Sequence, residues 1–317
     1  ICRVFLYYTG YYNKSNLVEL VTKNDVRVYI DDVIQNSGHK LLDNYADLWI
    51  YSPTYAGECN DEVVFTIKYT YKAFADQNQQ NGAQWQIMIG IRAQKHPEYH
   101  YPFGEGWGAG TVDPRLYNSY ELGDTRRDAS IICWDSMKLA EPLDISDMRE
   151  FTGFNWKKYC PLETPSGTRV VESLGGHYIT DNFEDYADIR FSDVLLMGAE
   201  LYLDADFGKA QQYYNLVRNR AFKGNAPVKT LTNDKNGKDL IFEERKHELA
   251  LEGQRYWDLL RYDGLAGNLN YAKSAIETTI PYEQHFRQET KGLLPIPWGQ
   301  INLMNGALKQ NEGWNME

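Results

Sequence analysis

Apolar residues recur with helical spacing in several separated stretches of this chain. Residues 1–20 and 25–37 predict two helices, because side chains three or four positions apart lie on one face of a helix. The apolar positions are Val4, Tyr7 and Tyr8 in the first helix and Val26, Ile30, Val33 and Ile34 in the second.

Residues 188–203 and 208–221 repeat this pattern, and residues 204–206 are expected to form the turn between them. The apolar positions are Phe191, Val194, Leu195 and Leu201 in the first helix and Ala210, Tyr213, Tyr214 and Val217 in the second. Two pairs of such helices are typical of tetratricopeptide-like hairpins.

Residues 242–262 also have helical spacing, but acids, arginines and aromatic residues crowd them. The predicted shared face carries Phe242, Leu249, Gly253, Tyr256 and Leu260. Glu244, Glu248 and Glu252 follow one another at intervals of four, and like charges at that spacing repel. Cations are therefore expected to neutralise these acids, and the nearest in sequence are Arg245, Arg255 and Arg261. This pattern predicts a structural network of ion pairs.

Between the helical stretches the pattern changes. Residues 62–69 are rich in Val, Ile, Phe and Thr and predict a strand in a small local sheet. Residues 78–113 are rich in glycine, glutamine, asparagine and aromatic residues, and the segment 99–110 reads YHYPFGEGWGAG. Long ordered loops of this kind are often functional.

Composition narrows the possible functions. The chain has 317 residues, 43% of them hydrophobic, which is enough for a sizeable core in one large or two moderate domains. A formal net charge of −11 argues against a nucleic-acid partner, because a phosphate-binding surface needs an excess of basic residues. No apolar run approaches the length of a membrane-spanning helix.

The four cysteines, Cys2, Cys59, Cys133 and Cys160, have no metal-binding spacing, and their disulfide state stays open. Cys2 is expected on the first helix as a small buried residue.

Four ordered blocks of sequence resemble one known family. Residues 242–262, FEERKHELALEGQRYWDLLRY, are similar to the C-terminal signature of the SusD/RagB family of glycan-binding outer-membrane lipoproteins. Residues 292–314, GLLPIPWGQINLMNGALKQNEGW, resemble the closing segment of that family. Residues 190–200, RFSDVLLMGAE, and 120–131, YELGDTRRDASI, resemble two of its earlier segments.

The resemblance implies a mainly α fold, a SusD-like α-α superhelix of tetratricopeptide-like hairpins with long irregular loops and a few short strands. It also implies that the chain is one SusD-like unit that lacks its N-terminal part. Within it we expect a helical hairpin region at 1–60, a loop-rich ligand-binding region at 61–180, and a helical hairpin with the C-terminal signature at 181–317.

In function, the resemblance implies a non-catalytic protein that binds oligosaccharide or polysaccharide and delivers it to a SusC-like TonB-dependent transporter. The expected location is the cell surface, on the outer membrane, through an N-terminal lipid anchor that this chain lacks. Some members of the family handle peptides instead, so a peptide-binding lipoprotein is an alternative. The abundance of aromatic residues favours a glycan.

The loop before residue 113 holds the side chains that a sugar needs. A pyranose ring stacks its C–H face on an aromatic ring, and its buried hydroxyls need polar partners, since each one left unpaired costs roughly 1–3 kcal/mol. The predicted ligand-binding residues are Trp85, Arg92, Tyr99, Tyr101, Phe103, Trp107 and, from a second aromatic patch, Trp156. Further polar partners nearby are Asn81, Gln84, Gln86, Glu105 and Asp113. The alternative for any one aromatic residue is that it fills the core of the loop itself.

The second aromatic patch consists of Trp134, Phe151, Phe154, Trp156 and Tyr159. In it Phe151 and Phe154 are expected to be buried, whereas Trp156 or Tyr159 would reach a ligand. The tryptophans in the signature blocks, Trp257, Trp298 and Trp314, are interpreted as structural.

Two other functions are weaker. A glycoside hydrolase needs two carboxylates facing each other across a cleft, and the 44 acidic residues leave such pairs open. However, the sequence has no compact acid motif at a strand end, and no G-x-S-x-G, H-E-x-x-H or phosphate-loop motif. Asp181, Glu184, Asp185 and Asp188 could bind calcium, but they lack the spacing of a calcium loop, and an acid-rich helix start explains them equally well. No other cofactor is expected.

Overall fold

The computed structural model describes residues 1–72, 82–92, 101–137 and 144–314. The chain divides into two compact units, one formed by Ile1–Val26 together with Gln254–Glu317 and the other by Arg27–Gly253. The two units do not coincide with the three predicted regions, because the first and last parts of the chain form one unit together.

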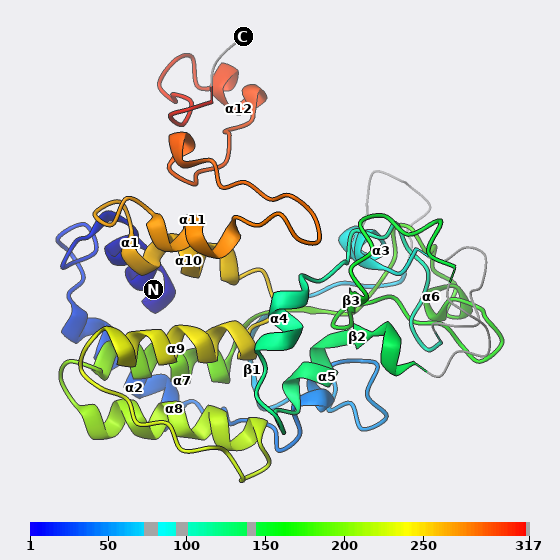
Figure 1. The fold of residues 1–317 in the computed structure, drawn as a ribbon, viewed down its shortest axis with the longest axis horizontal. Helices are drawn as coiled ribbons and strands as arrows, with labels where there is room; N and C mark the ends of the chain where they lie inside the picture. The colour runs from blue at the N-terminus through cyan, green and yellow to red at the C-terminus, as the bar shows by residue number, and fades with distance from the viewer. Residues whose placement is uncertain (73–81, 93–100, 138–143, 315–317) are drawn as a thin grey trace. The chain divides into compact units, whose positions relative to one another are not determined.

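The larger unit contains most of the helices. They are α2 (Lys23–Asn36, which begins in the smaller unit), α3 (Gln84–Ile89), α4 (Pro114–Ser119), α5 (Arg126–Ser130), α6 (Val170–Ser173), α7 (Phe191–Tyr202), α8 (Phe207–Ala221) and α9 (Lys235–Glu248). Short 3-10 turns lie at Tyr45–Leu48 and Trp134–Ser136. Helices α7, α8 and α9 pack side by side, and α3, α6 and the loops around them lie at the other end of this unit (Figure 1). The helix content agrees with the predicted mainly α fold.

The α7–α8 hairpin is confirmed. All eight apolar positions predicted for its two helices are buried: Phe191, Val194, Leu195, Leu201, Ala210, Tyr213, Tyr214 and Val217. Asp206 caps α8, because its carboxylate accepts a hydrogen bond of 3.0 Å from the backbone N–H of Lys209. Helix α7 begins at Phe191 rather than at residue 188, because the preceding residues form a strand.

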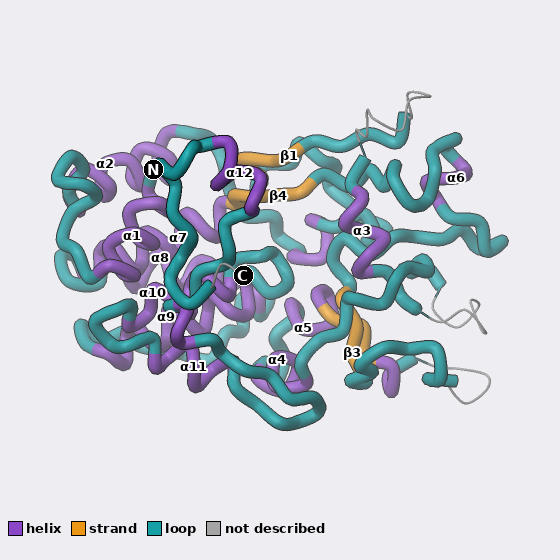
Figure 2. The backbone as a smooth tube through the Cα atoms, turned by 90° about the horizontal axis from the view of Figure 1, so that it is seen from above, coloured by secondary structure: helices purple, strands orange, loops and turns teal. Residues whose placement is uncertain are grey.

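Two small antiparallel sheets complete the larger unit. Strand β1 (Val63–Ile67) lies within the predicted strand and pairs with β4 (Tyr186–Arg190), as Figure 2 shows. The sheet is therefore not local, since its strands lie more than a hundred residues apart in the sequence. Strand β2 (Ile131–Cys133) pairs with β3 (Phe154–Trp156), in register from Ile131 opposite Trp156 to Cys133 opposite Phe154.

The smaller unit contains α1 (Cys2–Tyr12), α10 (Arg255–Asp263), α11 (Asn270–Ile276), α12 (Trp298–Leu303) and a 3-10 turn at Gln288–Thr290. Helix α1 packs against α10, and α10 against α11. The helix predicted at 1–20 is shorter than expected, and its face was predicted wrongly. Phe5, Leu6 and Tyr11 are buried, while Val4 is exposed. Cys2 lies on this helix but is only half-buried.

Side chains of the closing block hold its backbone. The amide of Gln310 bonds both the N–H and the carbonyl of Ile296, at 2.8 and 2.9 Å. The indole N–H of Trp314 donates to the carbonyl of Leu293 at 2.8 Å, so the structural interpretation of Trp314 is confirmed. Trp257 and Trp298 are more exposed than that interpretation implied.

Within the described ranges no helix combines the length and apolar character that crossing a membrane would require. All four cysteines lie in these ranges, and each is a free thiol.

The predicted continuous helix at 242–262 is wrong. Helix α9 ends at Glu248 and α10 begins at Arg255, so Leu249 and Gly253 do not share a helical face with Tyr256 and Leu260. In the break, Leu251 and Gly253 have φ values of 63° and 73°, and glycine adopts this left-handed region without the strain that a side chain brings. The break carries Glu252 to residues that a continuous helix would not reach.

Glu248 is the centre of a buried ion network in the larger unit. Its carboxylate contacts three arginines, Arg220 at 2.6 Å, Arg190 at 2.9 Å and Arg126 at 3.1 Å. All four side chains are almost fully buried. Burial alone would raise the pKa of Glu248, but the three guanidinium groups outweigh it and hold that pKa well below its usual range.

The buried charges of the network balance. Its carboxylates are Glu62, Asp124, Glu244, Glu248 and Glu252, and its cations are Arg126, Lys158, Arg190, Arg218 and Arg220. A buried charge is costly unless it is paired and hydrogen-bonded, so this balance allows the cluster to sit in the core. The predicted structural network is therefore confirmed.

Two of the three cations that were predicted for this network form ion pairs elsewhere. Arg245 instead pairs with Asp193 at 2.7 Å, and Arg261 pairs with Asp258 at 2.8 Å. Proximity in sequence was misleading, because the arginines that neutralise Glu248 come from α5, β4 and α8.

We expect Glu248→Gln to lower the free energy of unfolding by about 3–5 kcal/mol, because it leaves three buried arginines short of one negative charge. Urea unfolding at neutral pH measures this change. The matched control is Glu243→Gln, which removes a more exposed carboxylate paired with Lys246 on the same helix and should change stability by less than about 1 kcal/mol. Equal effects of the two substitutions would contradict the role given to Glu248.

Candidate functional site

The loop of residues 101–112 is fixed along one side by α3. The backbone N–H of Trp107 donates to the carbonyl of Ile87 at 2.8 Å, and that of Ala109 donates to the carbonyl of Met88 at 2.8 Å. Gly110 approaches the helix so closely that a Cβ atom there would lie 2.1 Å from the carbonyl oxygen of Ile89. The glycines of this segment thus allow a loop to lie directly on a helix end.

The other side of the loop is fixed by β3. The backbone N–H of Trp156 donates to the carbonyl of Gly110 at 2.7 Å, and that of Val112 donates to the carbonyl of Phe154 at 3.1 Å. Nearby, the N–H of Gly104 donates to the carbonyl of Pro161. The loop is therefore ordered by backbone hydrogen bonds on both sides, as a rigid binding loop requires.

Two of the predicted aromatic residues are available to a ligand. Trp107 is 45% exposed and Tyr101 is 49% exposed, so a face or edge of each ring remains in contact with solvent. Tyr99 lies outside the described residues.

The other predicted aromatic residues belong largely to the core. Phe103 is only 7% exposed and packs in a cluster with Ile132, Trp134 and Cys160, so its prediction as a ligand platform is not supported. Trp85 is half-buried, with its ring 5.3 Å from that of Tyr159 in an edge-on contact. For these rings the alternative, that the loop fills its own core, is the better description.

The second aromatic patch differs in detail from its prediction. Tyr159, predicted as one of two residues that could reach a ligand, is buried, and its hydroxyl accepts a hydrogen bond from the N–H of Ala187 at 3.2 Å. Trp156 is half-buried, as are Phe151 and Phe154, which were expected to be buried. Phe154 stacks on Tyr117 with ring centroids 4.4 Å apart.

Most predicted polar partners already have protein partners. Glu105 pairs with Arg169 at 3.1 Å, and Asp113 caps α4 and pairs with Arg115 at 2.6 Å. Gln86 is buried and donates to the carbonyl of Glu184. Asn81 lies outside the described residues, whereas Gln84 is exposed.

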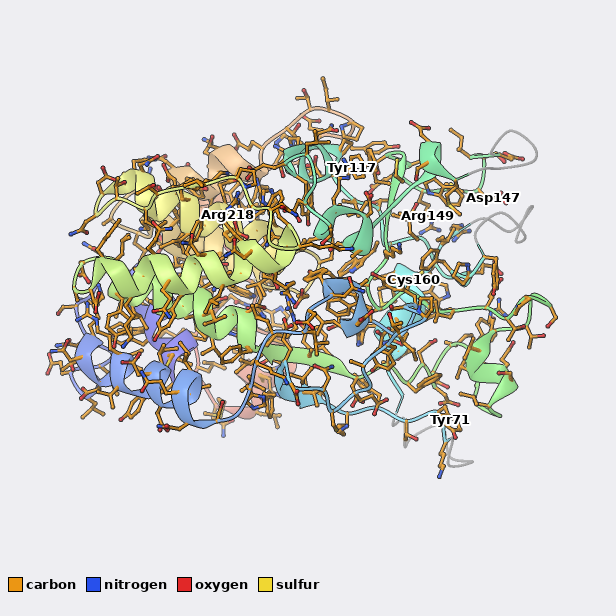
Figure 3. The ribbon with its side chains drawn as sticks, turned by 90° about the horizontal axis from the view of Figure 1, so that it is seen from below. Tyr71, Tyr117, Asp147, Arg149, Cys160 and Arg218 are labelled. Atoms are coloured by element: carbon orange, nitrogen blue, oxygen red, sulfur yellow. The ribbon has the colours of Figure 1, made fainter. Side chains whose placement is uncertain are left out.

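Arg92 remains available and lines a small pocket beside the loop. The pocket is lined by Ile91, Arg92, Gly108, Thr111, Met148, Arg149, Phe151 and Asn155. The side chain of Arg92 packs on Gly108, the residue after Trp107, since a Cβ atom on that glycine would lie 2.7 Å from the Cβ of Arg92. The sequence analysis missed Arg149, although it lies in the second aromatic segment, because no local spacing links it to Arg92. Figure 3 labels Arg149, which lies between Tyr117 and Asp147 in that view.

A second pocket contains the buried carboxyl group of Glu184, which the sequence suggested only as a possible calcium ligand. Its lining includes Ile87, Cys160, Arg169, Tyr178 and Glu184, and Figure 3 labels Cys160. Burial raises the pKa of Glu184 to about 8, Glu58 and Asp185 add to the rise, and a hydrogen bond from the N–H of Ile50 opposes it.

This raised pKa does not make the pocket a glycosidase site. Such enzymes hold two carboxyl groups roughly 5–10 Å apart on either side of the scissile bond. Among the described residues that line this pocket, Glu184 is the only acid. Glu244, in the signature block, is held by Arg126 and Arg218 at 2.6 and 2.9 Å.

The predicted calcium ligands do not converge. Asp181 accepts from the N–H of His177 at 2.7 Å, and Asp185 pairs with Lys68 at 2.8 Å. No group of three acidic, histidine or cysteine side chains in the described parts of the chain could hold a metal ion. The interpretation of these acids as a helix start is also wrong, because Asp188 lies on β4.

The pH dependence of stability tests the environment of Glu184. The folded protein keeps a proton on this carboxyl group at pH values where the unfolded chain has released it. The free energy of unfolding should therefore fall as pH rises from about 4.5 to about 8, by up to about 1.4 kcal/mol per pH unit from this group. Glu184→Gln should remove that part of the slope in urea titrations, while Glu172→Gln, at an exposed acid of α6, should keep it. A wild-type slope in Glu184→Gln would contradict this assignment.

Comparison with known proteins agrees with this architecture. The chain is 25% identical over 237 residues to SusD-like protein P2 of Formosa agariphila, a match that covers 72% of this chain and 44% of that protein. It is 26% identical over 313 residues to SusD-like protein P25 of the same organism, covering 90% of this chain and 54% of that protein. The chain thus spans about half the length of the curated relatives that it matches.

Solved structures have the same fold. Surface glycan-binding protein A from Bacteroides thetaiotaomicron superimposes with a TM-score of 0.74 at 23% identity, covering 98% of this chain and 62% of that protein. A laminarin-binding SusD-like protein superimposes with a TM-score of 0.72 at 24% identity, covering 99% and 61% of the two chains. The model of the SusD family matches residues 151–314, more than half of the 317 residues. The chain belongs to the SusD family.

Proposed function

We propose that this chain binds a glycan at the cell surface without cleaving it. The observation that carries the proposal is Trp107, an aromatic side chain that is half-exposed on a loop fixed by backbone hydrogen bonds to α3 and β3. A rigid, exposed indole offers a sugar ring a flat apolar face, and little conformational entropy is lost when the ring binds.

The solved relatives support this proposal. Surface glycan-binding protein A from Bacteroides thetaiotaomicron has also been solved in complex with laminarihexaose, and that structure superimposes on this chain with a TM-score of 0.74 at 24% identity. The SusD family consists of binding proteins rather than enzymes, in agreement with a signature block whose acids are neutralised in the core.

The proposal includes a location and a partner. The protein acts on the outer membrane, held there by a lipid anchor, and passes its glycan to a SusC-like TonB-dependent transporter for uptake. The family assignment supports both this location and this partner.

We expect Trp107→Ala to weaken binding of an oligosaccharide at least about tenfold, or about 1.4 kcal/mol, because it removes the exposed stacking surface. Isothermal titration calorimetry against a panel of glycans measures the change. The control is Trp298→Ala in the smaller unit, a tryptophan of nearly equal exposure, 46% against 45%, which should leave affinity unchanged.

Three outcomes would contradict the proposal. The first is equal loss of affinity in the two variants, and the second is binding of peptides but of no glycan in the panel. The third is release of reducing ends from a polysaccharide by the purified protein, which would instead identify a hydrolase.

A further inference from the structure

Two arginines, Arg92 and Arg149, line the same small pocket beside Gly108. Arg92 lies in the segment that follows α3, and Arg149 lies in the segment that precedes β3. The pocket also contains Gly108, which directly follows Trp107 in the loop of the proposed stacking surface.

Neither arginine forms an ion pair or a hydrogen bond with any residue that the structure describes. Arg149 does not pair even with Asp147, which lies two residues before it in the sequence. By contrast, Arg169 pairs with Glu105, Arg115 with Asp113 and Arg127 with Asp128, all at 3.1 Å or less. In a chain with a net charge of −11, two arginines at one pocket with no partner in the described part of the chain are a local exception.

This arrangement favours an anion. Two like charges that share a pocket repel each other, and a negative group between them replaces that repulsion with attraction. A guanidinium group matches the paired oxygens of a carboxylate or a sulfate, to which it can donate two hydrogen bonds.

The size of the pocket indicates which part of the ligand enters it. The free space in the pocket is about 10 Å³, the room for about one water-sized group, so a sugar ring stays outside it and only an oxygen atom of a substituent enters it. A charged substituent can reach the arginines from a ring that lies outside, and the apolar side chains of Met148 and Phe151 line the same pocket.

We propose that the glycan is anionic, and that Arg92 and Arg149 bind a carboxylate or sulfate group on it while a neighbouring ring stacks on Trp107. This inference rests on the proposed glycan-binding function and adds the class of glycan. The two arginines act as specificity-determining residues.

Binding of the full chain to three polysaccharides tests the inference: laminarin, which is neutral, alginate, which carries carboxylates, and carrageenan, which carries sulfates. We expect alginate or carrageenan to bind at least tenfold more tightly than laminarin, with an affinity that falls as salt is added. The polysaccharide that binds more tightly identifies the anionic group.

The variants Arg92→Gln and Arg149→Gln, and their combination, locate the effect. The double variant should lose at least tenfold in affinity for the anionic polysaccharide and change less than twofold toward laminarin. Arg115→Gln, which removes an exposed arginine already paired with Asp113, should behave as wild type. Thermal melting of each variant establishes that it is folded.

The outcomes separate this inference from the function on which it rests. Binding of laminarin as tight as that of both anionic polysaccharides would overturn the inference and leave glycan binding intact. Equal affinity of the double variant and wild type for the anionic polysaccharide would also overturn it. Failure to bind any polysaccharide would overturn both.

Discussion

The larger unit depends on one buried carboxylate, that of Glu248, which three arginines hold at 2.6 to 3.1 Å. Removing such charges from water costs several kcal/mol per ion, so the cluster persists only while every member keeps its partners. That requirement fixes the relative positions of α5, β4, α8 and α9, whose residues are far apart in the sequence. The signature block is thus a structural element, although its density of acids and arginines resembles that of an active site.

The same network reaches the proposed binding loop. Glu252, carried out of line by the break after α9, pairs with both Arg190 and Lys158. Burial lowers the pKa of Lys158 to about 8, and the attraction of Glu252 opposes that fall. Lys158 lies two residues after β3, which holds the loop of Trp107 through its backbone. Ion pairs in the core therefore support a loop whose aromatic side chain stays exposed.

Sequence alone was sufficient where structure follows local periodicity. The α7–α8 hairpin, its buried face and the turn at 204–206 were all predicted, because helical spacing is a local property. The ion-pair partners of Glu248 were not predicted, because Arg126 and Arg190 lie far from it along the chain. In the candidate site, the exposed state of Trp107 and the burial of Phe103 could not be separated, because both belong to one glycine-rich loop. Arg149 was missed for a related reason: only the fold brings it to the pocket of Arg92.

The central claim is that the ion network is scaffold and that the ligand site lies at the loop of Trp107. A crystal structure of the full chain with a bound oligosaccharide tests this claim most directly. The account predicts a sugar ring over the indole of Trp107, with the carboxylate of Glu248 still held by its three arginines. A sugar bound in the pocket of Glu184, with the face of Trp107 left in solvent, would contradict it.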